Sequence, residues 1–233
     1  DQIAMSSHNM SEVYVIDHST TSLEAAGHSG GNSGKGGDFL YRWGNPQVYQ
    51  AGFSGDKILK VCHDAHWIPV GSPNAGRLAA FNNDGISNQQ SCIDYVEPPV
   101  NGYVFDLNPG PAYGPNTYTA RTPCNGRSTN MSNSLQFPNG NTQICMATLG
   151  TIYEINAAGT VLWTKQVQGG FVPQAQRYSE CYINGDAEPT ALVSASQDTV
   201  CPNTNVDLML TPGGGTNYTY SWSSNPAGFS STS

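Results

Sequence analysis

The chain has 233 residues and a formal net charge of −8, so it can form one or two domains but has no basic stripe to neutralise the phosphates of a nucleic acid. No apolar run approaches the roughly 20 residues of a membrane-spanning helix, which argues against a membrane span. Hydrophobic residues make up 37% of the chain and aromatic residues 10%, which excludes a wholly disordered protein.

The composition predicts an all-β fold. Asp, Glu, Lys and Arg together make up only 11% of the residues, against roughly 25% in an average soluble protein. Gly and Pro occupy 26 and 15 positions. A chain with so few helix-sustaining residues and so many turn formers favours short strands joined by tight loops.

Alternating or β-branched runs recur along the chain and end at Gly, Asn, Asp or Pro, as strands do. They predict strands at residues 2–5, 12–17, 39–43, 58–62, 77–82, 91–96, 142–146, 151–155 and 161–165.

The hairpin signal is clearest around Asn139-Gly140, because this pair can adopt the positive φ angles of a type I′ turn. The strands that follow have the four-stranded rhythm of a β-propeller blade. The earlier hairpins fit this rhythm less regularly, and the Pro-rich stretch 98–123 is too irregular to assign. Residues 1–185 are therefore interpreted as a partial propeller of about three blades, whereas a closed ring needs four or more.

A change of composition near residue 186 predicts a linker at 185–189 and a second domain at 190–233. Its Cys201-Pro202 turn, the strand at 206–210 and the Tyr-x-Trp strand at 218–222 resemble the first part of an immunoglobulin-like or PKD-like β-sandwich of a secreted protein. Both ends of the chain read as interrupted β-patterns, so we expect a segment of a longer exported precursor, secreted, periplasmic or on the cell surface.

Six cysteines show neither a C-x-x-C pair nor zinc spacing. In an exported protein they predict at least one disulfide, and the alternative is a set of buried free thiols.

All five histidines lie within the first 66 residues, and His63 and His66 share one predicted strand. On a regular strand, two residues three positions apart face opposite sides unless a bulge intervenes. This spacing argues against a metal site, and no metal or other cofactor is expected. Either histidine could instead be a structural hydrogen-bonding residue.

Two motif segments carry a resemblance to a known family. Cys62-His63-Asp64-Ala65-His66-Trp67-Ile68-Pro69 and Phe81-Asn82-Asn83-Asp84-Gly85 resemble the "Q-H-x-A-W-I" and "F-D-N-G" strands of the arylsulfate sulfotransferases. The opening, Gln2 to His8, is similar to that family's "D-x-I-x-x-S-S-R" strand, and the resemblance extends over residues 1–183.

The resemblance implies transfer of a sulfuryl group from a phenolic sulfate ester to a phenol through a histidine intermediate. His63 stands at the position of the nucleophile, and a neutral imidazole is a competent nucleophile near neutral pH. His66 would orient the strand or contact substrate, and His8 replaces an arginine that binds the sulfuryl oxygens. The available substitutes for the family's other sulfate ligands are His18, Arg42, His66 and Lys35.

The Gly-rich stretch 27–37 lacks the order G-x-x-x-x-G-K-[ST], and nothing helical follows it, so a phosphate-binding loop is rejected. Two alternatives to an enzyme stay open. One is a non-catalytic propeller that serves as a binding or display module on the cell surface. The other is a structural or cargo subunit held by other chains of a surface or secretion assembly.

Overall fold

The computed structural model describes residues 1–105, 110–178, 180–185, 190–197, 199, 206–213, 221–223 and 230–232. These residues form mostly strands in several antiparallel sheets, so the all-β prediction is confirmed. The chain divides into two compact units, residues 1–176 and 177–233. In the described residues, no helix has both the length and the apolar character needed to cross a membrane.

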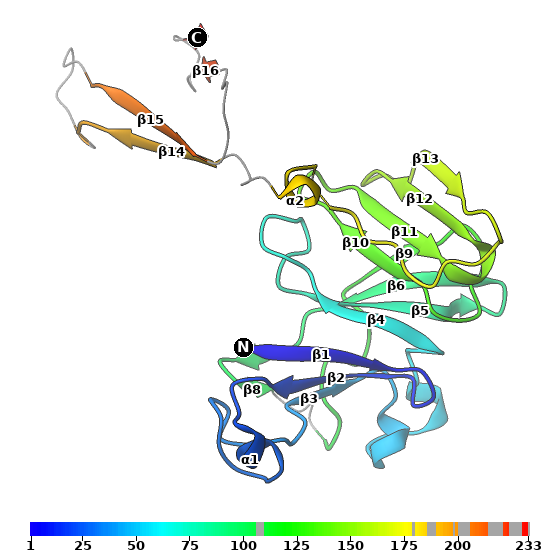
Figure 1. Cartoon of the computed structure of the whole chain (residues 1–233). Coiled ribbons are helices and arrows are strands. Elements are labelled where there is room, and N and C mark those ends of the chain that lie inside the picture. The colour runs from blue at the N-terminus through cyan, green and yellow to red at the C-terminus, as the bar shows by residue number, and fades with distance from the viewer. Residues whose placement is uncertain are drawn as a thin grey trace. The chain divides into compact units, whose positions relative to one another are not determined.

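The first sheet of unit 1 is a three-stranded meander of β1 (Gln2–Ser7), β2 (Glu12–Asp17) and β3 (Tyr41–Trp43) (Figure 1). Between β2 and β3, the short helix α1 (Ser22–Ala25) begins at a capping box. In that box the Thr21 hydroxyl accepts a hydrogen bond from the Glu24 N–H, and the Glu24 carboxylate accepts one from the Thr21 N–H.

The Gly-rich stretch that follows α1 folds around carboxylates of the chain itself. The buried Asp17 carboxylate accepts hydrogen bonds from the Ser33 N–H at 2.7 Å and from the Ser19 N–H at 2.8 Å. Removal from water raises the pKa of Asp17, but the hydrogen bonds from Ser19 and Ser33 outweigh this and hold it well below its usual value. The Gly31 N–H similarly points to the Glu24 carboxylate. These N–H groups are therefore engaged within the protein.

The second sheet has the order β4-β5-β6-β9 and the third the order β10-β11-β12-β13. A small hairpin of β7 and β8 lies between β6 and β9 in the sequence, and the 3-10 turns η1 and η2 precede β4. The bounds are β4 Cys62–Trp67, β5 Leu78–Ser87, β6 Gln90–Val96, β7 Val100–Asn101, β8 Val104–Phe105, β9 Ala120–Pro123, β10 Asn133–Gln136, β11 Thr142–Met146, β12 Thr151–Ile155, β13 Val161–Gln166, η1 Pro46–Tyr49, η2 Ser54–Asp56 and η3 Ala147–Leu149.

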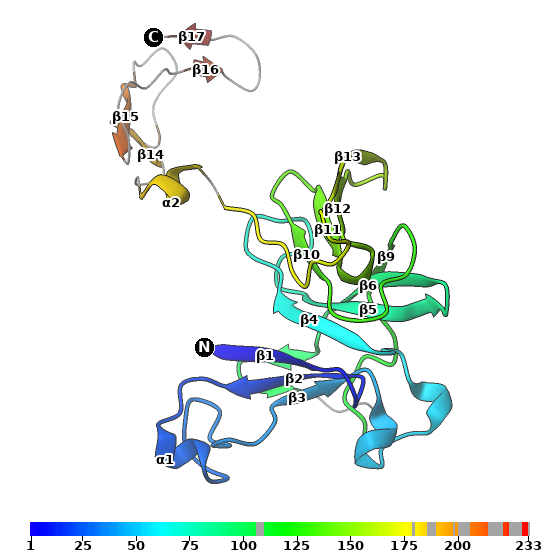
Figure 2. The same ribbon diagram turned by 45° about the vertical axis from the view of Figure 1, so that its right-hand side comes forward.

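Two apolar clusters hold the three sheets together. The first joins β2 and β3 to β5 and contains Val13, Val15, Trp43, Leu78 and Ala80 among its buried residues. The second joins the second sheet to the third through Phe81, Ile93, Tyr95, Ile144 and Met146. The first strands of the three sheets are neighbours, because β4 contacts both β1 and β10 (Figures 1 and 2).

Most strand predictions are confirmed, and 12–17, 142–146 and 151–155 match to the residue. The predicted strand at 58–62 is wrong. This run is apolar because Leu59 is buried in the core, whereas its backbone and that of Ile58 both donate to the Gly44 carbonyl. The strand begins only at Cys62. The unassigned stretch supplies β9, which completes the second sheet beside β6.

The hairpin at Asn139-Gly140 is confirmed, but the expected type I′ turn is not. Of the turn residues 138–140, only Gly140 has a positive φ, at +85°. The Gly140 N–H donates to the Phe137 carbonyl, and the Phe137 N–H donates to the Asn141 carbonyl. Pro138, whose ring requires a negative φ, therefore favours a turn with a single left-handed residue at its end.

Four cysteines, Cys62, Cys92, Cys124 and Cys145, are buried free thiols. The alternative of small apolar core residues therefore describes these four. The side chains of Cys181 and Cys201 lie outside the described residues, so the expectation of at least one disulfide stays a prediction.

Unit 2 begins with α2 (Glu180–Asn184) and contains two antiparallel strand pairs. β14 (Thr190–Ala195) pairs with β15 (Leu208–Gly213), and β16 (Ser221–Ser223) pairs with β17 (Ser230–Thr232). All of the predicted linker after Gly185, the Cys201-Pro202 turn and most of the Tyr-x-Trp strand lie outside the described residues. The β-sandwich assignment therefore stays a prediction.

Candidate active site

The predicted histidine site lies where the first strands of the three sheets meet. His8 directly follows β1, His63 lies on β4, and Ser132 directly precedes β10. The rings of His8 and His63 make an edge-to-face contact with centroids 5.2 Å apart. The fold thus brings together two of the three histidines that the sequence assigns to catalysis.

A bulge in β4 places the third histidine on the same face as His63. His63 lies opposite Phe81 and His66 opposite Ala79, so three steps on β4 match two on β5. Because directly paired residues point to the same face of a sheet, His63 and His66 share a face. Asp64, within the bulge, has a φ of +57°, which a non-glycine residue seldom adopts.

Both ring nitrogens of His63 have partners. Nδ1 is 2.9 Å from Oδ1 of Asn83, and Nε2 accepts a long hydrogen bond of 3.3 Å from the Met131 N–H. The same N–H also donates to Oδ1 of Asn130 at 2.9 Å, so its bond to Nε2 is shared and weak. Burial lowers the pKa of the half-buried His63; the Asn83 hydrogen bond partly opposes this, and the nearby His8 lowers it further. The ring is therefore neutral at neutral pH.

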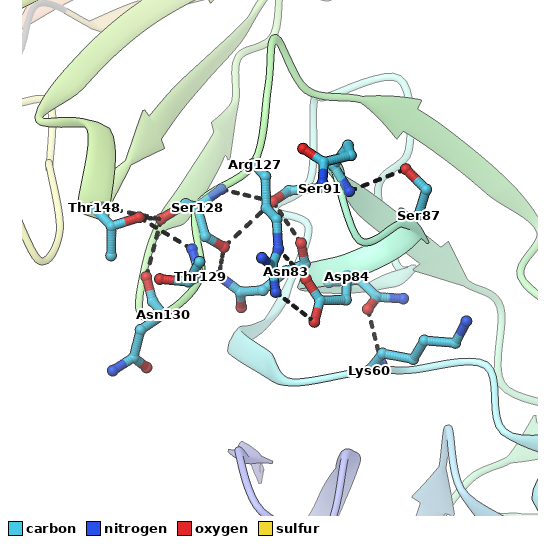
Figure 3. A network of polar contacts seen from close by, with 12 residues as sticks. Lys60, Asn83, Asp84, Ser87, Ser91, Arg127, Ser128, Thr129, Asn130 and Thr148 are labelled. Atoms are coloured by element: carbon cyan, nitrogen blue, oxygen red, sulfur yellow. Dashed lines mark hydrogen bonds and ion pairs between the residues drawn. The ribbon is translucent and has the colours of Figure 1, made fainter.

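The segment that holds the Met131 N–H against His63 is itself fixed by buried hydrogen bonds (Figure 3). This segment, residues 124–132, connects β9 to β10. The fully buried Ser128 donates its N–H to Oγ of Ser91 at 3.0 Å, and its Oγ accepts from the Thr148 N–H at 3.0 Å. The Arg127 guanidinium binds both carboxylate oxygens of Asp84, at 2.6 and 3.1 Å.

Backbone strain concentrates around His63. Positive φ values, between 53° and 84°, occur at Val61 and Asp64, which are close to His63 in the sequence. They also occur at Met131 and Ser132, at the end of the 124–132 connection. For residues with a side chain this region costs energy, and such residues persist only where the surrounding structure fixes them. Strain of this kind is found preferentially at functional sites.

The His66 side chain is hydrogen-bonded to Asp64. Its Nδ1 is 2.9 Å from the Asp64 carbonyl oxygen and 3.3 Å from the carboxylate, which also accepts the Ser134 N–H at 2.8 Å. Burial lowers the pKa of His66, but the hydrogen bonds and charge of Asp64 outweigh it, and the net pKa is raised. His66 therefore fits the orienting role better than that of a nucleophile.

A cavity of about 290 Å³ opens beside His63 and is lined by His63, Asp64, Met131, Ser132, Pro173 and Gln174. A larger cleft of about 550 Å³, lined among others by Trp43, Tyr49 and Tyr113, has no histidine in its wall. The smaller cavity is the one relevant to histidine chemistry, because it exposes the strained backbone and the His63 ring.

Two of the residues expected to bind sulfate, Arg42 and His18, are engaged elsewhere. Arg42 donates to the fully buried carboxylate of Glu12 at 2.6 Å, and its guanidinium lies 4.3 Å from the ring centroid of Tyr49. The exposed His18 lies 3.3 Å from the Asp1 carboxylate. Of the predicted oxyanion-binding residues, only His8 contacts His63.

Three features of this site, namely Asn83, Asp64 and the 124–132 connection, are not among the residues predicted from the sequence. Asn83 lies in the motif that carries the family resemblance, and Asp64 lies between two candidate histidines, so both had a local signal. Nothing in the sequence of the connection indicates that its backbone reaches a residue 68 positions earlier.

Among the described residues, no group of three or more His, Cys, Asp or Glu side chains is arranged to hold a metal ion. Comparison with protein families, with curated proteins and with solved structures finds no match for this chain.

Proposed function

We propose that this chain carries the nucleophilic histidine of a sulfuryl-transfer site and that His63 is that residue. The observation that carries the proposal is a neutral imidazole held through Nδ1 by Asn83, with Nε2 in a long, shared hydrogen bond beside a cavity. An imidazole in this state has its reactive lone pair on Nε2.

The reaction would proceed in two displacements. Nε2 of His63 attacks the sulfur of a phenolic sulfate ester, so that an N–S bond forms, the S–O bond to the aryl group breaks, and the phenolate leaves and takes up a proton from water. The oxygen of an acceptor phenol then attacks the same sulfur, the N–S bond breaks, and the acceptor's proton passes to solvent. Splitting one displacement into two is the general advantage of covalent catalysis.

Charge on the sulfuryl oxygens needs donors that are in place before the reaction. His8 lies against the His63 ring, and the Met131 N–H already points at the reactive nitrogen. Both could contact a group transferred to Nε2. In this proposal Arg42 acts as a structural residue of the first sheet, because its guanidinium is committed to Glu12.

The three sheets of unit 1 would be blades of a partial β-propeller. The support is that β1, β4 and β10, each the first strand of its sheet, are adjacent, and that apolar clusters lie between successive sheets. The second unit would be the start of an immunoglobulin-like domain, and the whole an exported protein.

A non-catalytic binding or display module is the second candidate. The observation that favours it is the engagement of Arg42 and His18 with carboxylates of the chain itself, which removes two expected sulfate ligands.

An assay of the native protein with 4-nitrophenyl sulfate as donor and phenol as acceptor tests the proposal. We expect release of nitrophenol that is lost in His63→Ala and kept in the matched control His28→Ala, whose side chain is 89% exposed and binds Asp38. Turnover that survives in His63→Ala would contradict the assignment of the nucleophile. No turnover by the wild type with several aryl sulfates would favour the display module.

A further inference from the structure

The Asn83 side chain joins the ring of His63 to the 124–132 connection. It is fully buried on β5, and its Oδ1 lies 2.9 Å from Nδ1 of His63. Its Nδ2 donates to the carbonyl of Ser128 at 2.6 Å and to that of Met131 at 3.2 Å. Figure 3 shows Asn83 and Ser128 within this network.

The surroundings allow only one orientation of the Asn83 amide. Exchanging its oxygen and nitrogen would place Oδ1 against two carbonyl oxygens, with no hydrogen between them, in a site without exposure to water. Oδ1 therefore faces His63. Since an amide oxygen only accepts hydrogen bonds, the hydrogen between it and Nδ1 must be carried by Nδ1.

The other ring nitrogen leads to the same result. The Met131 N–H, which also donates to Oδ1 of Asn130, points at Nε2, and a lone pair on Nε2 of the neutral ring can accept this weaker, shared bond. The carbonyl of the same residue, Met131, accepts from Nδ2 of Asn83. Both ends of the imidazole thus contact one network, in which the buried Asn83 defines the Nδ1 end.

We propose that Asn83 is a positioning residue that fixes His63 in the tautomer with hydrogen on Nδ1 and the lone pair on Nε2. Its role in catalysis rests on the proposed function, whereas the tautomer is a property of the folded protein alone. A partner on one ring nitrogen that sets the chemistry of the other is a general device of histidine sites.

Nitrogen NMR of the ¹⁵N-histidine-labelled native protein, at about pH 8 where a histidine of ordinary or lowered pKa is neutral, measures this directly. We expect a protonated Nδ1 and an unprotonated Nε2 for His63. In Asn83→Leu, which removes the acceptor, the signal should shift toward the form with hydrogen on Nε2. Asn83→Asp keeps an acceptor for the Nδ1 hydrogen and, with its second carboxyl oxygen protonated so that it donates to the Ser128 carbonyl, should retain the original tautomer.

The neighbouring Asn82 offers the matched control. It is equally buried on the same strand, but it donates to the Ile58 carbonyl and to the Asp94 carboxylate. Asn82→Leu should leave the tautomer of His63 unchanged. A wild-type His63 with hydrogen on Nε2 would overturn the proposal even if every variant failed to fold, and so would an unchanged tautomer in a folded Asn83→Leu.

A parallel activity measurement separates the two proposals. If His63 is the nucleophile, kcat in Asn83→Leu should fall about 10²-fold or more, since loss of the correct histidine tautomer in a Ser-His-Asp triad costs about 10⁴-fold. Asn83→Asp should restore part of this loss. The expected tautomer together with an inactive wild type would support the role of Asn83 on the ring and contradict the proposed function.

Discussion

Replacing Arg42 by methionine should destabilise the protein strongly, because Arg42 is the cation paired with a buried carboxylate. Glu12 has a side chain with no exposed surface, and its Oε2 accepts from Arg42 at 2.6 Å and from the Tyr14 hydroxyl at 3.0 Å. The Arg42 side chain is only 19% exposed. Removal of the guanidinium would leave the carboxylate with one donor from a side chain and no compensating charge.

The expected size follows from this burial. Removing one partner of a buried ion pair costs about 3–5 kcal/mol, because the remaining charge stays in a poorly solvated place. For a domain of this size, each 1 kcal/mol lowers the melting temperature by about 2–4 °C. Arg42→Met should therefore melt about 6–20 °C below the wild type.

Urea unfolding followed by tryptophan fluorescence measures the free energy of unfolding. Arg77→Met is the matched control, because Arg77 lies 3.6 Å from a Glu97 side chain that is 68% exposed. A pair this exposed contributes about 0–1 kcal/mol at most. The double substitution Glu12→Leu with Arg42→Met removes both charges and should recover most of the loss.

Two results would refute this reasoning. The first is a loss of stability in Arg42→Met no larger than that in Arg77→Met. The second is a double variant as unstable as the single one. A folded, stable Arg42→Met protein that loses only substrate affinity would instead support the sequence-based assignment of Arg42 as a sulfate ligand.

Three further predictions concern the site and its supporting core. The raised pKa of His66 stabilises the folded protein, and this stabilisation is complete at pH values below 6.5, the usual pKa of histidine. It is lost as the pH rises from 6.5 through the raised pKa. The free energy of unfolding should therefore decline over this pH range in the wild type and stay flat in Asp64→Asn. Burial raises the pKa of the Cys62 and Cys124 thiols to about 12, so Ellman's reagent should react with them only on unfolding, and a fast reaction in the native state would contradict their placement. Gly150→Ala should lower the free energy of unfolding by at least about 1–2 kcal/mol, measured by thermal unfolding, because Gly150 has a φ of +60° and a Cβ there would lie 2.5 Å from the backbone of Gly170. An unchanged stability would show that the turn is misplaced.

The parts of the fold that depend on local pattern could be predicted from the sequence. The strands Thr142–Met146 and Thr151–Ile155 have alternating or β-branched residues between clear turn formers. The capping box of Thr21 and Glu24 is a local signal of the same kind, although the sequence analysis did not use it. β9 was missed because its short run ends in a proline and pairs with β6, which lies far away in the sequence.

The candidate site was predicted only in part, for a similar reason. The resemblance pointed to His63, His66 and His8, and the structure brings His8 and His63 into contact. Whether His63 and His66 share a face depended on a bulge that no residue pattern specifies. The role of Asn83 depends on carbonyl groups of a connection far away in the sequence, so it becomes visible only in three dimensions.

The central claim is that His63 forms a covalent bond to the transferred group. Mass spectrometry of the native protein, mixed with 4-nitrophenyl sulfate in the absence of an acceptor and digested at neutral pH, tests it most directly. We expect one sulfuryl group on the peptide that contains His63, released by acid and absent from His63→Ala. Nitrophenol release without modification of that peptide, or the same modification on another residue, would contradict it.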